Sequence, residues 1–179
     1  LLDWLTGLED PLLSEALGFG FVPLTILRDG PFGPGSLQQF IAHNPDYHYF
    51  AFKPADRERL RPVVLFDLLA NNADRKRSHV FFQKRTRRLY AIDHGLCFHV
   101  EDKLRTVLWE FAGEPFPGEL VAVLTELRAA FHSSLLPVLT AYLLPEEISA
   151  LRTRLETLIA DPVFPLPPSD RRAFPYPPV

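Results

Sequence analysis

Two acidic residues in short polar segments are the candidates for chemistry in this sequence. Asp74 lies in segment 71–76 (N-N-A-D-R-K), and Asp93 follows 19 residues later in segment 91–95 (A-I-D-H-G). Phosphoryl transfer uses two carboxylates in this order, because one orients the acceptor hydroxyl and the second, at the end of a strand, holds the cation that neutralises the phosphate. The two segments together therefore favour a phosphoryl-transfer site.

Three predicted elements must position these acids. The apolar run from Pro62 to Ala70 predicts a buried helix that ends at the loop of the first acid. Strand-like runs at 79–83 and 88–92 predict a hairpin, whose second strand delivers Asp93 into a turn. Gly95 in that turn would let the backbone approach a bound phosphate closely.

The two motifs resemble those of the phosphatidylinositol 3/4-kinase-like superfamily. They are most similar to its small bacterial members, whose loop reads N-N-x-D-R-K and whose metal turn reads I-D-H-G-x-C-F. The resemblance covers residues 10–112 and implies an α+β, protein-kinase-like fold, with a mostly helical C-terminal lobe, an incomplete small β lobe and a hinge. It also implies ATP-dependent phosphoryl transfer with Mg²⁺ or Mn²⁺. The hydroxyl acceptor stays open between lipid, protein and small molecule, because acceptor choice does not follow from fold.

The resemblance assigns a role to each residue of the two segments. Asp74 orients the attacking hydroxyl, and Lys76 contacts the γ-phosphate as a point charge. Asp93 is the implied metal ligand. His79 stands where most kinases carry asparagine. Because Mg²⁺ prefers oxygen ligands, His79 is a poor magnesium ligand, a manganese-tolerant ligand, or a hydrogen-bonding residue that leaves the metal to Asp93 and water.

Each of these residues also has a simpler explanation. An isolated N-N-x-D segment is more often a capping loop than a catalytic one, and Asp93 alone would be a turn-initiating residue. Lys76 could belong to a solvated face, and we expect Arg75 to pair within its own loop. The basic run 84–88 predicts an exposed hairpin turn. Both acidic motifs in the right order favour the kinase-like interpretation over these alternatives.

An earlier hairpin is predicted from strand-like runs at 24–27 and 36–41, separated by a turn over 28–35 that is rich in glycine and proline. In the resembling family, the segment that leaves the second strand is the hinge that receives adenine. The resemblance therefore implies that Gln39, Phe40 and Ile41 bind the nucleotide.

One family feature is missing. Kinases of this superfamily anchor the α- and β-phosphates with a lysine on a small-lobe strand, but the first lysine here is Lys53, beyond the implied hinge. Either the anchoring strands precede residue 1, or ATP binds unconventionally, or the protein is no longer a kinase. The sequence has no methionine and begins with leucine, which favours the first explanation. The alternative function is a pseudokinase or interaction module, and a weaker one is nucleotidyl or other group transfer.

The remaining sequence predicts helices and a tail. Apolar spacing predicts helices over 104–111, 120–131, 134–143 and 145–160. Seven of the 18 prolines lie from Pro162 onward, so this tail is extended, either on the domain or disordered. The predicted organisation is a remnant of the small lobe and hinge (1–42), a helical catalytic lobe (43–161) and a proline-rich tail (162–179).

Composition limits the classes of function. The chain has 179 residues and a formal charge of −3, so no strong basic field indicates a nucleic-acid partner. No apolar run reaches the length of about 20 residues that a membrane-spanning helix needs. The single cysteine, Cys97, favours a reducing, cytoplasmic location. The oligomeric state stays open.

Overall fold

Helix α3 (Arg61–Ala70) lies at the centre of the computed structural model, which describes residues 9–31 and 33–179. Every residue from Val63 to Ala70 is buried, so this stretch has no solvent face. Pro62 stands in the first turn, where its missing N–H group costs nothing, and Asn71 ends the helix in the left-handed conformation (φ 57°, ψ 48°). The predicted buried helix is confirmed.

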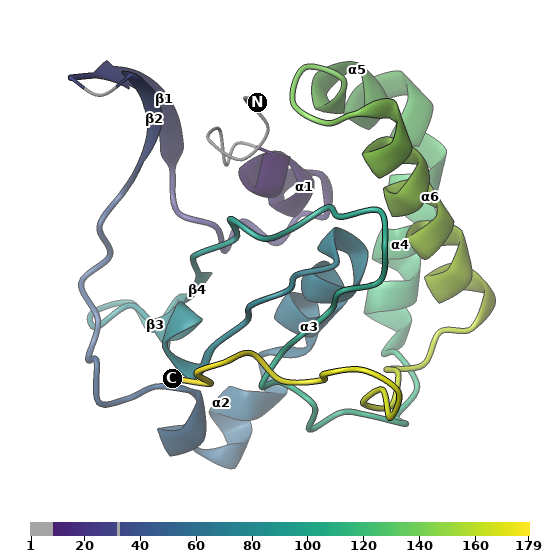
Figure 1. Cartoon of the computed structure of the whole chain (residues 1–179). Coiled ribbons are helices and arrows are strands. Elements are labelled where there is room, and N and C mark those ends of the chain that lie inside the picture. The colour runs from purple at the N-terminus through teal and green to yellow at the C-terminus, as the bar shows by residue number, and fades with distance from the viewer. Residues whose placement is uncertain (1–8, 32) are drawn as a thin grey trace.

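Most of the other elements lie around α3, whereas the hairpin of β1 and β2 extends away from it (Figure 1). Helices α1 and α6 contact α3, and α4 packs beside α6. Their bounds are α1 (Glu9–Ala16), β1 (Thr25–Gly30), β2 (Gly33–Gln38), η1 (Tyr49–Ala51), α2 (Pro54–Glu58), η2 (Arg77–His79), β3 (Val80–Phe82), β4 (Leu89–Ala91), α4 (Gly118–Ala130), η3 (Phe131–Leu135), α5 (Leu136–Leu139) and α6 (Pro145–Ala160). The α+β class is confirmed, whereas the two-lobed kinase-like arrangement stays a prediction.

Both predicted hairpins form, each as a two-stranded antiparallel sheet. In β3–β4, Val80 faces Ala91 and Phe82 faces Leu89, so the strands lie within the predicted runs 79–83 and 88–92. In β1–β2 the pairing runs from Thr25–Gln38 to Gly30–Gly33, so the strands continue through most of the predicted eight-residue turn. The chain therefore reverses inside the predicted segment, but the turn is shorter than predicted, because Gly33, with φ 107°, allows a tight reversal.

The predicted helix over 104–111 is wrong. Its apolar residues are buried, but its backbone pairs with distant segments instead of with its own preceding turn. The Arg105 N–H donates to the Asn72 carbonyl (2.9 Å), and the Arg105 carbonyl accepts from the Arg75 N–H (3.0 Å). The Thr106 N–H donates to the Ala173 carbonyl (3.0 Å). These bonds fix the segment beside the loop of Asp74.

The C-terminal helices agree with the predictions in two cases out of three. Helices α4 and α6 are confirmed, and α6 has the predicted bounds. The predicted helix over 134–143 is shorter: a π-helical turn (η3) precedes α5, which begins at Leu136 beside Pro137 and ends at Leu139. Proline has no backbone N–H group, so it suits the start of this short segment. Among the described residues, no helix combines the length and apolar character needed to cross a membrane.

The proline-rich tail lies on the domain, which decides between the two predicted alternatives (Figure 1). Phe164 is buried against Phe111 and Phe116, with ring centroids 5.5 and 4.6 Å away. The Ala173 carbonyl accepts hydrogen bonds from the Thr106 N–H and the Trp109 indole. Farther along, the Pro178 carbonyl accepts from the N–H of Arg77, next to the candidate site (3.2 Å).

We predict that Phe164→Ala destabilises the protein by about 3–5 kcal/mol, because it leaves a cavity between two aromatic rings. Phe174→Ala, at an exposed position of the same tail, is the matched control and should change stability by no more than about 0.5 kcal/mol. Urea unfolding followed by circular dichroism measures both. Equal, small effects would mean that the tail is not part of the folded core.

Candidate functional site

The loop after α3 is held by its two asparagines. The Asn71 amide donates to the carbonyls of His99 (2.9 Å) and Glu101 (2.7 Å), and its oxygen accepts from the Lys103 N–H (2.9 Å). Asn72 is fully buried; its oxygen accepts from the Asp74 N–H (3.0 Å). The capping-loop explanation is therefore correct for the asparagines, and their bonds fix the backbone from which Asp74 projects.

Arg75 links the two acidic segments from the interior of the protein. Its guanidinium is fully buried and donates to both carboxylate oxygens of Asp67 in α3, at 2.9 Å from Nε and 2.8 Å from Nη2. Its Nη1 donates to the carbonyl of Ile92 (2.9 Å), the residue before Asp93. The expectation that Arg75 pairs within its own loop is wrong. Asp67, which the sequence analysis missed, is the single charged residue between Pro62 and Ala70, and that was its signal.

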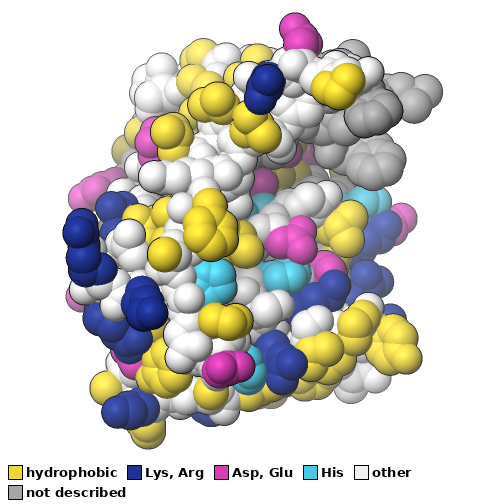
Figure 2. All heavy atoms as spheres, turned by 90° about the vertical axis from the view of Figure 1, so that its left-hand side faces the viewer, with side chains coloured by type: hydrophobic (Ala, Val, Ile, Leu, Met, Phe, Trp, Pro, Cys, Tyr) yellow, Lys and Arg dark blue, Asp and Glu magenta, His cyan; other side chains and the backbone are white. Residues whose placement is uncertain are grey.

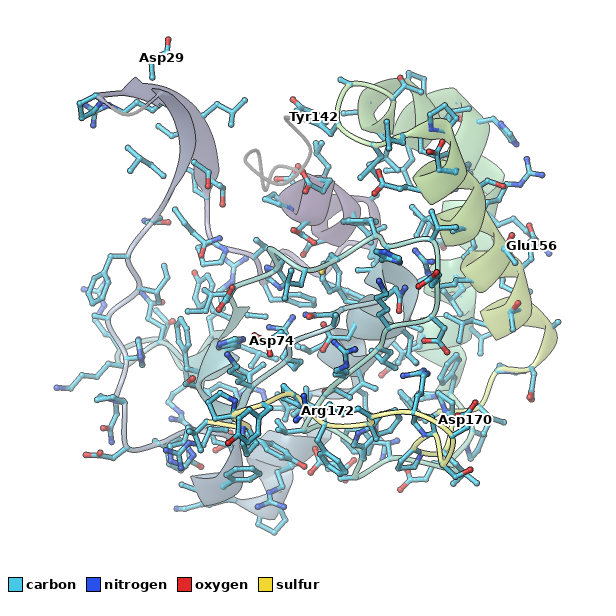
Figure 3. The ribbon with its side chains drawn as sticks, viewed as in Figure 1. Asp29, Asp74, Tyr142, Glu156, Asp170 and Arg172 are labelled. Carbon is cyan, nitrogen blue, oxygen red and sulfur yellow. The ribbon has the colours of Figure 1, made fainter. Side chains whose placement is uncertain are left out.

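The four predicted catalytic and metal residues form one chain of contacts. The Lys76 ammonium lies 2.9 Å from the Asp74 carboxylate, and the Lys76 N–H faces Nδ1 of His79 at 3.4 Å. Nε2 of His79 lies 3.1 Å from the Asp93 carboxylate. The fold thus brings Asp74, Lys76, His79 and Asp93 together. Figure 3 shows Asp74 in the middle of the molecule, far from Asp29 at the tip of the β1–β2 hairpin.

The turn after β4 presents Asp93 to solvent. Its side chain is 60% exposed, although one oxygen contacts His79, so it can accept further partners. The left-handed conformation belongs to Asp93 itself (φ 58°), and Gly95 does not share it. Asp tolerates this conformation better than most residues. Close approach of the Gly95 backbone to a bound phosphate stays a prediction.

Residues 84–86 form the turn between β3 and β4, and the whole basic run 84–88 is exposed, as predicted. Figure 2 shows Lys and Arg side chains gathered on this face, below the apolar side chains of the β1–β2 hairpin. Part of the charge is neutralised locally, because Arg87 and Arg59 both contact Asp56, at 2.7 and 3.5 Å. This cluster is a surface turn and is separate from Lys76.

The implied hinge residues lie on the segment after β2. The Gln39 N–H donates to the Leu24 carbonyl (2.8 Å), and the Ile41 carbonyl lies 2.9 Å from Nδ1 of His43. Ile41 is buried, whereas the Phe40 side chain is 84% exposed. Nucleotide binding by Gln39, Phe40 and Ile41 stays a prediction, and Phe40 has its aromatic face available for a ligand.

Asp93 and His79 provide too few ligands to hold a metal ion without other ligands. Among residues 9–31 and 33–179, no group of three or more His, Cys, Asp and Glu side chains could hold a metal ion. A divalent ion at the Asp93 carboxylate would take its remaining ligands from phosphate oxygens and water, which is the usual way in which Mg²⁺ binds with a nucleotide. The exposed carboxylate suits that role.

Two buried histidines flank the site. Burial lowers the pKa of His79, and Asp93 opposes this shift while Arg75 and Lys76 reinforce it. Burial also lowers the pKa of His94 well below its usual value, and the Arg75 charge adds to the effect. His94 packs edge-on against Phe66, with 5.2 Å between the ring centroids.

A comparison with known proteins identifies a relative. The chain is 36% identical to Protein Rv2133c of Mycobacterium tuberculosis (strain ATCC 25618 / H37Rv) over 201 residues, which cover 93% of this chain and 72% of the relative. This chain belongs to the family of Protein Rv2133c. No protein-family model matches the sequence. The name of the relative carries no activity, so the chemistry of this Rv2133c-family protein rests on its own site.

We predict that Asp67→Asn destabilises this Rv2133c-family protein by about 3–5 kcal/mol, because it leaves the buried charge of Arg75 without its partner. The matched control is Glu156→Gln, which removes the exposed ion pair with Arg128 and should cost no more than about 1 kcal/mol. Chemical denaturation gives both free energies. A small loss for Asp67→Asn would show that the ion pair does not hold the site together.

A second prediction concerns pH. His94 stays neutral in the folded state but takes up a proton in the unfolded state below its ordinary pKa of 6.5. The free energy of unfolding is therefore highest, as far as His94 contributes, above pH 6.5 and decreases as the pH falls below 6.5. Between pH 7.5 and 5.5 this linkage amounts to about 1.4 kcal/mol.

The variant His94→Leu should lose this part of the pH dependence. Asp10, whose pKa burial raises, acts in the opposite direction but contributes equally to both proteins, so it cancels in the comparison. The measurement is the free energy of unfolding of wild type and variant at pH 7.5 and 5.5. The same pH dependence in both proteins would exclude a neutral, buried His94.

Proposed function

We propose that this protein transfers the γ-phosphoryl group of ATP to a hydroxyl acceptor, as an enzyme of the phosphatidylinositol 3/4-kinase-like type. The observation that carries the proposal is the contact chain from Asp74 through Lys76 and His79 to Asp93. Two acidic segments that are separate in the sequence meet there, over a buried ion pair that fixes both. Phosphoryl transfer depends mainly on such positioning and on charge stabilisation.

Each residue has a defined part in this proposal. The Asp74 carboxylate orients the acceptor hydroxyl and receives its proton as the new P–O bond forms, while the bond to the β-phosphate oxygen breaks and ADP leaves. Lys76 balances charge on the γ-phosphate. Asp93 would hold Mg²⁺ or Mn²⁺, which supplies charge neutralisation when bound, and His79 orients the Asp93 carboxylate through its 3.1 Å contact.

The resemblance supports ATP as the donor, with Gln39, Phe40 and Ile41 as the adenine contacts. The acceptor can be lipid, protein or small molecule. A cytoplasmic location, which the single cysteine favours, would supply ATP.

A second candidate is a pseudokinase or interaction module that has lost phosphoryl transfer. The observation in its favour is the exposed apolar surface of the β1–β2 hairpin, which includes Leu24, Ile26, Leu27 and Leu37 (Figure 2). An isolated two-stranded sheet is marginally stable, so this surface calls for a covering partner. The same hairpin could also receive further strands of a nucleotide-binding lobe, so it does not decide between the two functions.

The deciding experiment is Asp74→Ala in the full-length protein. We expect turnover of the γ-phosphate of ATP to fall by a factor on the order of 10²–10⁴, because the orienting carboxylate is lost, with little change in ATP affinity. Asp46→Ala, in an exposed loop outside the site, is the control and should retain wild-type turnover. Lipid, protein and small-molecule acceptors are tested in parallel. Equal turnover in wild type and Asp74→Ala with every acceptor would support the interaction module instead.

A further prediction tests the metal. Asp93→Asn should weaken ATP binding by about 10-fold or more in Mg²⁺ but leave metal-free binding unchanged, because the carboxylate acts through the ion. His79→Asn is the companion variant: if His79 contacts the ion, this change shifts the preference from Mn²⁺ toward Mg²⁺. Isothermal titration calorimetry measures all affinities. Equal affinities of wild type and Asp93→Asn in the presence of metal would remove Asp93 from the metal site.

A further inference from the structure

A groove of about 730 Å³ lies between α6, the C-terminal tail and the loop before Trp109. One wall is a single stripe of α6 that includes Ala150, Arg154 and Leu158. Pro165 and Leu166 of the tail form the opposite wall. The volume falls within the range of about 300–1,000 Å³ typical of small-molecule sites. Neither Asp74 nor Asp93 lines this groove, so it is separate from the candidate phosphoryl-transfer site.

The surface of the groove is largely apolar. Leu166 is 71% exposed and Val100 about half exposed, and both lie on the groove together with Leu104 and Trp109. When a ligand covers a concave apolar surface that is open to solvent, apolar area is removed from water, which favours binding.

Arg154 places a positive charge in this apolar setting. Its Nε donates to the Leu69 carbonyl (2.7 Å) and its Nη1 to the His99 carbonyl (3.3 Å), while its Nη2 is buried and finds no acceptor within the described chain. No carboxylate of the described residues forms an ion pair with it. Burial lowers the pKa of Arg154 to about 10, which is the effect of a charge that its surroundings do not fully compensate.

The other charges near the groove supply only part of the missing counter-charge, since the Asp102 carboxylate raises the pKa of Arg154 without cancelling the effect of burial. Asp102 is paired with Arg171 at 2.6 Å. Glu146 is exposed and lies eight residues earlier in α6, or about 12 Å along the helix axis. The carbonyls at the end of α3 contribute roughly half an elementary negative charge, so part of the Arg154 charge stays uncompensated.

We propose that this groove binds a small amphiphile with one carboxylate and an apolar chain. The carboxylate would pair with the Arg154 guanidinium, because hydrogen bonds between two charged groups are stronger than those between neutral groups. The chain would cover Leu166, Val100 and Trp109. A neutral lipid would add no counter-charge for Arg154. A multiply charged ligand would be repelled by Asp102 and Glu146 and would leave the apolar walls exposed. This site does not depend on the proposed phosphoryl transfer.

The test uses Trp109 as the reporter. The chain has two tryptophans, so Trp4→Phe leaves Trp109 as the single tryptophan, which is excited selectively over the tyrosines. The probes are decanoate, its methyl ester and decylamine, each below its micelle concentration at pH 7.5. We expect decanoate to bind about tenfold tighter than the ester, and decylamine to bind most weakly. No saturable change with decanoate, or equal affinity for decanoate and ester, would overturn the proposal.

Variants then test the role of Arg154. Arg154→Gln should reduce the affinity for decanoate to that for the ester and leave the ester affinity unchanged. Because Arg154 also binds the Leu69 carbonyl, a second variant avoids any effect on folding. Thr157→Glu, at an exposed position one turn along α6, places a carboxylate beside Arg154 and should remove the same preference with an unchanged circular dichroism spectrum. Thr125→Glu, in α4 and outside the groove, is the control. If Thr157→Glu keeps the full preference for decanoate, the carboxylate does not bind at Arg154.

Discussion

The buried ion pair between Arg75 and Asp67 is the interaction on which the rest of the structure depends. Moving a guanidinium and a carboxylate out of water costs several kcal/mol for each ion, so the pair is tolerated only when its hydrogen bonds are made. Arg75 meets this requirement with both oxygens of Asp67 and the carbonyl of Ile92. A central helix, the loop after it and the end of β4 must therefore converge at one point. The same convergence brings Asp74 and Asp93 to one site.

Buried and exposed residues have different tasks at this site. Asp67, Asn72 and Arg75 are buried and hydrogen-bonded to one another, and they hold the backbone. Asp74 and Asp93 retain exposure to solvent, and they are free to exchange partners. A rigid base that holds solvent-accessible charges in place suits electrostatic catalysis, because charges that are already positioned require little reorganisation when a substrate binds.

The sequence predicts the elements whose signals are local. Helix α6 begins at Pro145, followed by two glutamates in its first turn, and its start could be predicted from these residues alone. Segment 104–111 shows the limit, since its apolar residues are spaced as in a helix while its backbone bonds go to Asn72, Arg75 and Ala173. Burial of these residues was predictable, but the partners of their backbone groups were not, because they come from distant parts of the chain.

The candidate site was also predictable only in part. The residue types and order of the two motifs identify Asp74, Lys76, His79 and Asp93, and the structure brings all four together. The residues that hold these four in place could not be predicted from motif spacing. Arg75 binds Asp67, eight residues earlier, and the carbonyl of Ile92, 17 residues later. Only the charge of Asp67 inside an apolar helix indicated a buried partner.

The end of α3 also shows why a loop can be this well fixed. The last carbonyls of a helix lack the usual partners from the following turn and must be satisfied otherwise. In α3, the Asp67 carbonyl accepts from the N–H groups of Asn71 and Asn72, and the Leu69 carbonyl accepts from Arg154. The helix thus ends between the buried ion pair of the candidate site and the arginine of the groove. Both the candidate site and the groove therefore rest on one helix turn, and the backbone of segment 71–76 has little freedom to move from the position that holds Asp74.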